Sequence, residues 1–369
     1  MNPEEILSAI EIQVDKVHTQ SLDLSFNELL DMYESGELDI SPDYQRLFRW
    51  TEGASSRFIE SLLLEMPVPP IYVVETETGV YQLIDGLQRF SSYLHLRGEL
   101  TAEHKSIKKG DFLTLVDCDI VESLNGLKYD DLPTALKIKL KRSFVRVEVV
   151  RKGSDSKFKY HMFKRLNTGG EALTAQQIRN CTIRMLDPKF NDFIIELSKN
   201  PDYVNCISNI SEVQNLGAYN EELVLRYFTF RNNREAFKHD ISDFLTEYME
   251  GVSSGAVAFD YAENRENFAK VFSLFNKTHG DKVFGRISSD DKLQSNFNIY
   301  HFESLTMGIQ QIIERLDLSN AEVLENYKQR IINLKKDQTF KIETTGGGKN
   351  SPGPLRKRIE IAERYFVGG

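Results

Sequence analysis

The chain has 369 residues, of which 40% are hydrophobic and 27% are charged, and its formal net charge is −9. The length allows a large core and two domains, and the composition is ordinary for a globular protein. The acidic balance argues against a surface dominated by nucleic-acid binding but leaves room for a local basic groove. No apolar run approaches the roughly 20 residues of a membrane span, and the acidic N-terminus is unlike a secretory signal.

The hydrophobic pattern predicts an α+β first half and a nearly all-helical second half. Ser25 is expected to cap a helix whose apolar face carries Leu29, Leu30 and Met32. We expect two helices within residues 4–36, further helices at 54–65, 87–98 and 133–140, an ordered loop at 40–50, and strands at 71–75, 80–84, 112–116 and 144–150. From residue 156 onward only the Gly-rich stretch 344–353 departs from a helical pattern. Two domains are therefore expected, 1–155 and 156–369.

The most informative local pattern is the turn Asp85-Gly86 between an apolar strand and an amphipathic helix that begins with Gln88 and Arg89. Unpaired backbone N–H groups and the positive end of the dipole make a helix N-terminus suitable for an anion. An arginine there adds a forked donor set that matches a phosphate. The pattern equally fits Asp85 as an ordinary N-cap and Arg89 as a solvated helix residue.

A second constellation interleaves the aromatic residues Tyr44, Phe48 and Trp50 with Arg46 and Arg49. Aromatic rings beside arginines suit stacking on a nucleobase with charge on a phosphate. The alternative is a loop held in the core by its aromatic residues, with exposed arginines. The segment alone does not decide between them.

A third constellation, Asn167-Thr168-Gly169-Gly170, joins two helical patterns, the second with Thr174 as its expected N-cap. Paired glycines allow positive φ and close approach to a ligand, but an ordinary helix C-cap explains them as well. Asn167 together with Arg165 and Arg179 nevertheless marks the region as a candidate ligand site.

The stretch 344–351 only superficially resembles a phosphate loop, because Gly348-Lys349 is followed by Asn350 and the Walker spacing is missing. A basic loop before a final helix at 355–366 is the better interpretation, with Arg356, Lys357 and Arg358 as phosphate contacts. The scattered histidines and the absence of a Gly-x-Ser-x-Gly elbow exclude the common zinc-protease and serine-hydrolase templates. Three separated cysteines, without a Cys-x-x-Cys pair, favour a reducing cytoplasm.

Taken together, the ordered motifs resemble one known family. The motifs are Pro42–Arg46 with Trp50, Glu60–Leu64 with Pro67–Tyr72, Ile84–Arg89, and Arg165–Gly170 with Leu173–Asn180. They resemble the N-terminal domain of GmrSD-type modification-dependent restriction endonucleases, over roughly residues 20–185. The resemblance implies a ParB/sulfiredoxin-like small mixed sheet with helices, followed here by a mainly α-helical C-terminal region.

The same resemblance implies a nucleotide-binding, NTP-hydrolysing component of a prokaryotic anti-phage restriction system that uses NTP with Mg²⁺. It implies catalytic roles for Asp85, Gln88 and Arg89, with Asp85 also as a metal ligand. It implies a nucleotide pocket formed by Tyr44, Gln45, Arg46, Gly86, Asn167, Thr168, Gly169 and Gly170. The family signature is Asp-Gly-Gln-Gln-Arg, and Leu87 replaces its first glutamine.

The residues after 190 carry no pattern of a His-Asn-His nuclease, so DNA cleavage is expected from a separate nuclease subunit. The expected partners are therefore a nucleotide, phage or modified DNA, that subunit and further copies of the chain. The alternative hypothesis is a non-enzymatic ParB-like module that binds DNA or a partner and senses a nucleotide.

Overall fold

A computed structural model describes residues 3–14, 18–40, 48–76, 78–154, 162, 174–183, 186–238, 240–288 and 290–368. The chain divides into two compact units, Met1–Leu173 and Thr174–Gly369. The first is α+β and the second is helical, as the sequence predicts. The domain boundary predicted at residue 155 lies at the start of the segment 155–173, of which only residue 162 is among the described residues.

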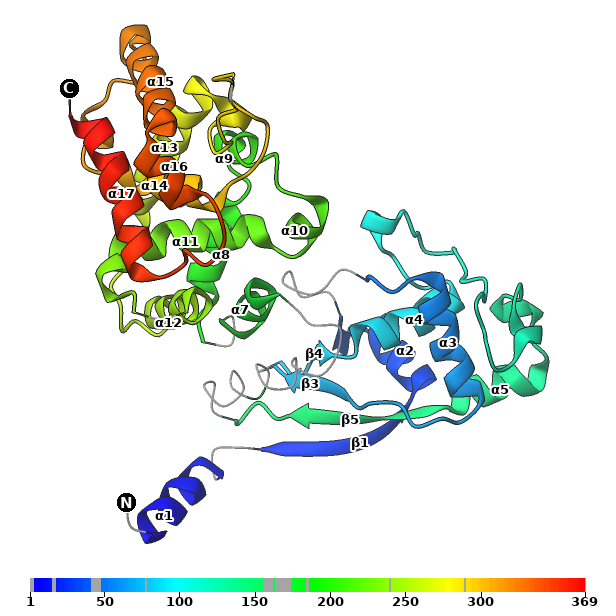
Figure 1. Cartoon of the computed structure of the whole chain (residues 1–369). Helices are drawn as coiled ribbons and strands as arrows, with labels where there is room; N and C mark the ends of the chain where they lie inside the picture. Colours follow the sequence, from blue (N-terminus) through cyan, green and yellow to red (C-terminus); the bar gives the residue numbers. More distant parts are fainter. Residues whose placement is uncertain are drawn as a thin grey trace. The chain divides into compact units, whose positions relative to one another are not determined.

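Unit 1 is built on a five-stranded mixed sheet with strand order β1-β5-β3-β4-β2 (Figure 1). The strands are β1 (Thr19–Ser25), β2 (Leu38–Asp39), β3 (Ile71–Glu75), β4 (Tyr81–Asp85) and β5 (Phe144–Val150). The pairs β1–β5 and β3–β4 are antiparallel, whereas β3–β5 and β2–β4 are parallel. Because of this register, the C-terminal end of β4 and the N-terminal ends of β3 and β5 lie at the same end of the sheet.

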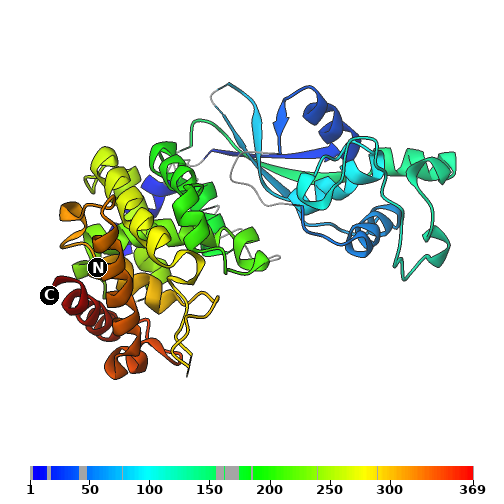
Figure 2. The ribbon, with the colours of Figure 1, turned by 90° about the horizontal axis from the view of Figure 1, so that it is seen from above.

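Helices α2, α3 and α4 cover one face of this sheet (Figure 1, Figure 2). The helices of unit 1 are α1 (Pro3–Val14), α2 (Phe26–Glu34), α3 (Glu52–Leu63), α4 (Leu87–Arg97) and α5 (Thr134–Arg142), with one-turn 3₁₀ helices η1 (Glu103–Lys105), η2 (Glu122–Leu124) and η3 (Tyr129–Asp131). Strand β5 alternates: Val145, Val147 and Val149 are buried in the core, whereas Arg146 is exposed and pairs with Asp23 directly opposite on β1. The period-2 pattern thus selects the face that the helices cover.

Most of the elements predicted for unit 1 are confirmed, including the Ser25 cap, whose side chain accepts a hydrogen bond from the Glu28 N–H. The two helices expected within residues 4–36 are present as α1 and α2, but the segment between them, 19–25, is the unpredicted strand β1, which pairs with β5 over its full length. The strand predicted at 112–116 is wrong. Leu113 and Leu115 are buried, but their N–H groups bond to the carbonyls of His95 and Leu127 in irregular structure. The apolar alternation there reflects burial rather than sheet pairing.

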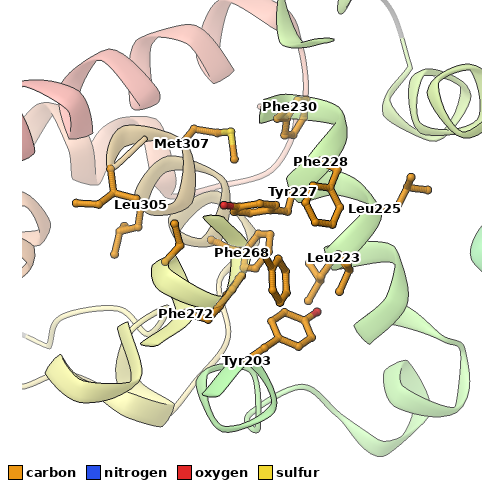
Figure 3. Packing of buried hydrophobic residues seen from close by; sticks show 14 of the residues in the cluster. Tyr203, Leu223, Leu225, Tyr227, Phe228, Phe230, Phe268, Phe272, Leu305 and Met307 are labelled. Atoms are coloured by element: carbon orange, nitrogen blue, oxygen red, sulfur yellow. The ribbon is translucent and has the colours of Figure 1, made fainter. Parts of the chain in front are cut away.

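Unit 2 is helical throughout its described residues apart from its loops and one isolated bridge. Its α-helices are α7 (Ala175–Ile183), α8 (Pro188–Leu197), α9 (Pro201–Cys206), α10 (Glu212–Leu216), α11 (Tyr219–Asn233), α12 (Ile241–Ser253), α13 (Tyr261–Thr278), α14 (Ile299–Gly308), α15 (Ala321–Lys336), α16 (Gln338–Thr344) and α17 (Pro352–Val367). Aromatic rings fill the core where α11 and α13 meet (Figure 3). The ring centroids of Tyr227 and Phe268 are 5.2 Å apart. Among the described helices, none has both the length and the apolar character to cross a bilayer.

Candidate functional site

The predicted strand–turn–helix is present, and Gly86 makes its sharp turn. Gly86 has φ +106° and is the N-cap of α4, and the described residues supply no side-chain cap hydrogen bond to this helix. A Cβ at Gly86 would lie 2.8 Å from Ile71 Cγ1 and 3.2 Å from Arg89 Nη2. Glycine is therefore required both by the backbone conformation and by the close packing of the β3 residue. The interpretation of Asp85 as the N-cap is wrong.

The Arg89 guanidinium and the Asp85 carboxylate, which flank Gly86 in the sequence, form an ion pair. Arg89 Nη2 donates to Asp85 Oδ2 and to the Pro70 carbonyl, both at 2.9 Å. The two side chains are 13% and 25% exposed, so Arg89 is not the freely solvated residue of the alternative interpretation. Arg89 Nε is buried and has no hydrogen-bond partner within the described ranges. A donor of this charged group is thus available beside an uncapped helix N-terminus.

Gln88 is buried and acts on the backbone of a distant segment. Its Oε1 accepts hydrogen bonds from the N–H groups of Arg49, at 2.8 Å, and Trp50, at 3.1 Å. From the opposite side, Lys105 Nζ donates to the Trp50 carbonyl at 2.5 Å, and His104 Nε2 lies 2.8 Å from the Phe48 carbonyl. The segment 48–50, which follows the predicted ligand residues Tyr44, Gln45 and Arg46, is therefore held by side chains of α4 and η1.

The aromatic residues of this segment are packing residues. Phe48 is buried with Lys105 Nζ 4.8 Å from its ring centroid, and the Trp50 ring lies 5.8 Å from that of Phe58. For these two rings the core alternative is confirmed. Sequence reasoning missed Lys105 and His104, because nothing in the local pattern connects them to a segment more than 50 residues earlier.

Leu87 occupies a position that faces the core. Its side chain is 7% exposed and belongs to the hydrophobic cluster formed by α2, α3, α4 and the sheet. The apolar substitution in the signature therefore leaves the polar groups of Asp85, Gln88 and Arg89 in place.

Of the fourth motif, the described residues 174–180 contact other segments of unit 2. Thr174 caps α7 as predicted, since its Oγ1 accepts from the Gln177 N–H, and Gln177 Oε1 accepts from the Thr174 N–H in return. The Gln177 amide and the Thr174 hydroxyl also donate to the carbonyls of Leu216 and Gly217. Reciprocal bonds of this kind make a capping box.

Arg179 is buried and belongs to this contact rather than to a phosphate site. Its guanidinium donates to Gln176, Ser242 and Thr246 and pairs with Glu222 at 3.3 Å. The suggestion that Arg179 meets a ligand is therefore wrong. Asn167, Thr168, Gly169 and Gly170, like Tyr44, Gln45 and Arg46, lie outside the described residues, and their assignment to the pocket stays a prediction.

Comparison with known proteins agrees with this arrangement of motifs. Residues 26–184 match the family model of the GmrSD restriction endonuclease N-terminal domain. This segment belongs to the GmrSD N-terminal domain family. No curated protein and no solved structure gives a significant match to the chain. The match includes the whole turn at Asp85 and ends within unit 2, just after α7, so the GmrSD segment includes the first helix of the helical unit.

The Gly-rich stretch after the GmrSD segment is a connection between two helices, α16 and α17, and not a phosphate loop. Arg358 is fully buried, pairs with Glu303 and donates to the Lys349 carbonyl at 2.8 Å. Its expected contact with nucleic-acid phosphates is therefore wrong, whereas Arg356 and Lys357 are exposed.

Asp85 offers one carboxylate to a metal ion. No cluster of three or more His, Cys, Asp or Glu side chains suited to a metal occurs among the described residues. Mg²⁺ in nucleotide sites uses one or two carboxylates together with waters and the substrate phosphates. The donor set at the turn therefore fits a metal that arrives with a nucleotide rather than a metal held by the protein alone.

Proposed function

We propose that this chain is the nucleotide-binding and NTP-hydrolysing component of a restriction system. The chain carries a domain of such systems. The observation that carries the proposal is the uncapped N-terminus of α4 beside the Arg89–Asp85 pair. Backbone N–H groups and a guanidinium converge there on one small region, which is the arrangement that phosphate recognition uses. Restriction-domain membership supports a role in defence against phage DNA in the cytoplasm.

The charges at the turn support different roles for Arg89 and Asp85. Arg89 is mostly withdrawn from water, where its charge stabilises a developing phosphate charge more strongly than in solvent. In our proposal a phosphate takes the place of the Asp85 carboxylate on Arg89, and Asp85 then orients the attacking water or holds Mg²⁺. The metal, when bound, would supply neutralisation of the phosphate charges.

The remaining predicted residues complete the proposed pocket. Gln88 acts as a positioning residue, since its oxygen holds the backbone of segment 48–50. Tyr44, Gln45 and Arg46 lie just before that segment in the sequence, and we propose that they contact the nucleotide together with Gly86 and the residues 167–170. The ParB-like fold is part of the same proposal.

DNA cleavage is assigned in this proposal to a separate nuclease subunit. In the helical unit, His279 lies 3.1 Å from the Lys328 carbonyl of α15, and His301 lies 3.0 Å from the Gly285 carbonyl. Neither belongs to a group of three or more His, Cys, Asp or Glu side chains suited to a metal in the described part of the unit.

The test is phosphate release by the full chain with Mg²⁺ across a panel of NTPs, with and without modified phage DNA. We expect release with at least one NTP and its loss in Arg89→Ala. The matched control is Arg57→Ala, which removes an exposed arginine of α3 in the same unit and should retain activity. Absence of turnover with every NTP, with and without DNA, would disprove the proposal of hydrolysis.

One observation favours the alternative, a binding module that senses a nucleotide without cleaving it. Asp85 and Gln88 are both engaged in intramolecular bonds, which suits a ligand-driven exchange of partners. This alternative predicts calorimetric nucleotide binding without turnover, and DNA binding that persists in Asp85→Ala. Turnover that depends on Asp85 would exclude it.

A further inference from the structure

A groove of unit 1 lies apart from the residues proposed for the nucleotide site. This α3–α5 groove, as we call it, has a volume of about 740 Å³ and lies between the end of α3, helix α5 and the start of β5. Its apolar lining includes Met66, Ile138 and Phe144, which are 42%, 44% and 67% exposed. Exposed apolar side chains gathered in one hollow, rather than scattered singly over a surface, indicate a binding site.

The charged residues of the α3–α5 groove leave one positive charge in excess. Its lining contains the acids Asp23 and Glu65 and the bases Lys139, Arg142 and Arg146. Asp23 pairs with Arg146 and Glu65 pairs with Lys139, which leaves the exposed Arg142 as the excess charge. One excess charge suits a ligand with a single negative charge, whereas the two acids oppose the many phosphates of a nucleic acid.

The size of the α3–α5 groove suits a small molecule. Small-ligand sites have volumes of about 300–1,000 Å³, a mostly apolar lining and a few polar groups that orient the ligand. We propose that the groove binds a small amphiphilic anion, that is, an apolar body with one carboxylate. The body lies against Ile138 and Phe144, and the carboxylate pairs with Arg142.

One wall of the α3–α5 groove continues directly to Arg89. Pro67 and Val68 line the groove, and Pro70, two residues further on, accepts a hydrogen bond from Arg89 Nη2 at 2.9 Å. Proline fixes its own φ and restricts the residue before it, so the Pro-Val-Pro-Pro segment 67–70 is stiff. A ligand that shifts Val68 therefore also shifts the carbonyl that holds Arg89.

An occupied groove thus regulates the turn at which the nucleotide is proposed to bind. This regulation rests on the proposed function, because Arg89 acts there on a nucleotide. The binding of the anion does not rest on it, since the groove contains neither Asp85, Gln88 nor Arg89.

Calorimetric titration of the full chain with decanoate tests the binding site. We expect saturable binding, and at least a tenfold higher dissociation constant for Ile138→Glu and for Arg142→Glu. The matched controls are Val213→Glu, at an 80% exposed residue of α10, and Arg356→Glu, at an exposed residue of α17. Both should leave the constant unchanged. Circular dichroism establishes that each variant is folded.

Two further probes separate the apolar body from the charge. Acetate has the charge without the body, and decyltrimethylammonium has the body with the opposite charge, so both should bind at least tenfold more weakly than decanoate. Equal binding of the three probes would overturn the proposal. A decanoate affinity that neither Ile138→Glu nor Arg142→Glu lowers would overturn it as well, because decanoate would then bind elsewhere.

Helix α1 is the competing occupant, since its Ile6, Leu7 and Ile10 are 44%, 60% and 55% exposed. Leu7→Glu places a charge among these apolar side chains and should leave decanoate binding unchanged. Binding that appears only in Leu7→Glu would assign the groove to α1 and overturn the proposal.

Hydrogen exchange with and without decanoate tests the connection to Arg89 and needs no nucleotide. We expect decanoate to slow exchange in residues 66–72 and to change it at least twofold in residues 86–92. Pro69→Gly softens the segment without removing a lining residue, so it should keep decanoate binding and lose the effect at 86–92. Unchanged exchange at 86–92 in the wild type would overturn the connection. Changed exchange in a chain that binds no NTP would instead refute the proposed function, while it confirms the groove and its connection to Arg89.

Discussion

At the scale of single residues, two separate features require glycine at position 86: its positive φ and its close contact with Ile71. Gly86→Ala introduces a Cβ both at positive φ and 2.8 Å from Ile71, so we expect a loss of about 2–3 kcal/mol in the free energy of unfolding. Gly79 has φ +88° with nothing within 4 Å of the added Cβ, and Gly79→Ala should cost only about 1 kcal/mol. Urea denaturation measures both. Equal losses would mean that the contact with Ile71 contributes nothing.

Gln88 should act on nucleotide binding through the segment that it holds. Gln88→Leu leaves the N–H groups of Arg49 and Trp50 without their acceptor, and we expect nucleotide affinity to fall about tenfold or more. Gln88→Glu keeps an oxygen acceptor and should restore much of the affinity. Lys105→Met, which releases the same segment from its other side, should resemble Gln88→Leu.

Calorimetric titration of these three variants with the NTP identified for the wild type measures the effect. A Gln88→Leu variant with normal affinity and no turnover would contradict a positioning role and favour direct catalysis. A Lys105→Met variant with normal affinity would show that the segment does not need to be held.

At the scale of helices, a buried network of charges joins four helices of unit 2. Arg179 of α7 and Arg226 of α11 share Glu222, and Arg226 and Arg358 of α17 share Glu303 of α14. Removing one member of a buried network leaves its partners charged and unsolvated. The network therefore makes the packing of α7, the last helix of the GmrSD segment, depend on distant helices.

Glu303→Gln tests this dependence, because it leaves two buried arginines short of one negative charge. We expect the free energy of unfolding to fall by about 3–5 kcal/mol. The control is Glu263→Gln, which breaks the pair between Arg231 and a glutamate that is 66% exposed and should cost less than about 1 kcal/mol. Chemical denaturation compares the two, and similar losses would refute the role of the buried network.

At the scale of the whole molecule, buried histidines make stability depend on pH. Burial lowers the pKa of His279 to about 4 and that of His301 well below its usual value. Both stay neutral in the folded chain, while the unfolded chain binds protons from about pH 6.5 downward. The free energy of unfolding should therefore fall as pH falls from about 6.5 toward 4, by about 2 kcal/mol for His279 between pH 7 and pH 5.

Denaturation of the wild type, His279→Gln and His18→Gln at pH 7 and pH 5 checks this expectation. His279→Gln should lose less stability on acidification than the wild type. His18 is exposed, and His18→Gln should behave as the wild type. An identical pH dependence in all three proteins would contradict a buried neutral His279.

The sequence by itself determined the features that depend on neighbours a few residues apart. Strand, turn and helix at 81–97, the caps at Ser25 and Thr174 and the helical second half all follow from local hydrogen bonds and side-chain periodicity, which act over about four residues. For the same reason the ordered motifs were enough to identify the GmrSD segment.

Only the tertiary structure decided what the polar side chains of those motifs contact. Gln88 reaches N–H groups about 40 residues away, Arg179 is buried against α11 and α12, and Leu87 faces the core. The residues 112–116 and 19–25 look alike as short alternating runs, but only the second finds a strand to pair with. Long-range partners depend on how the chain packs, because burial and hydrogen bonding between distant segments leave little trace in the local pattern.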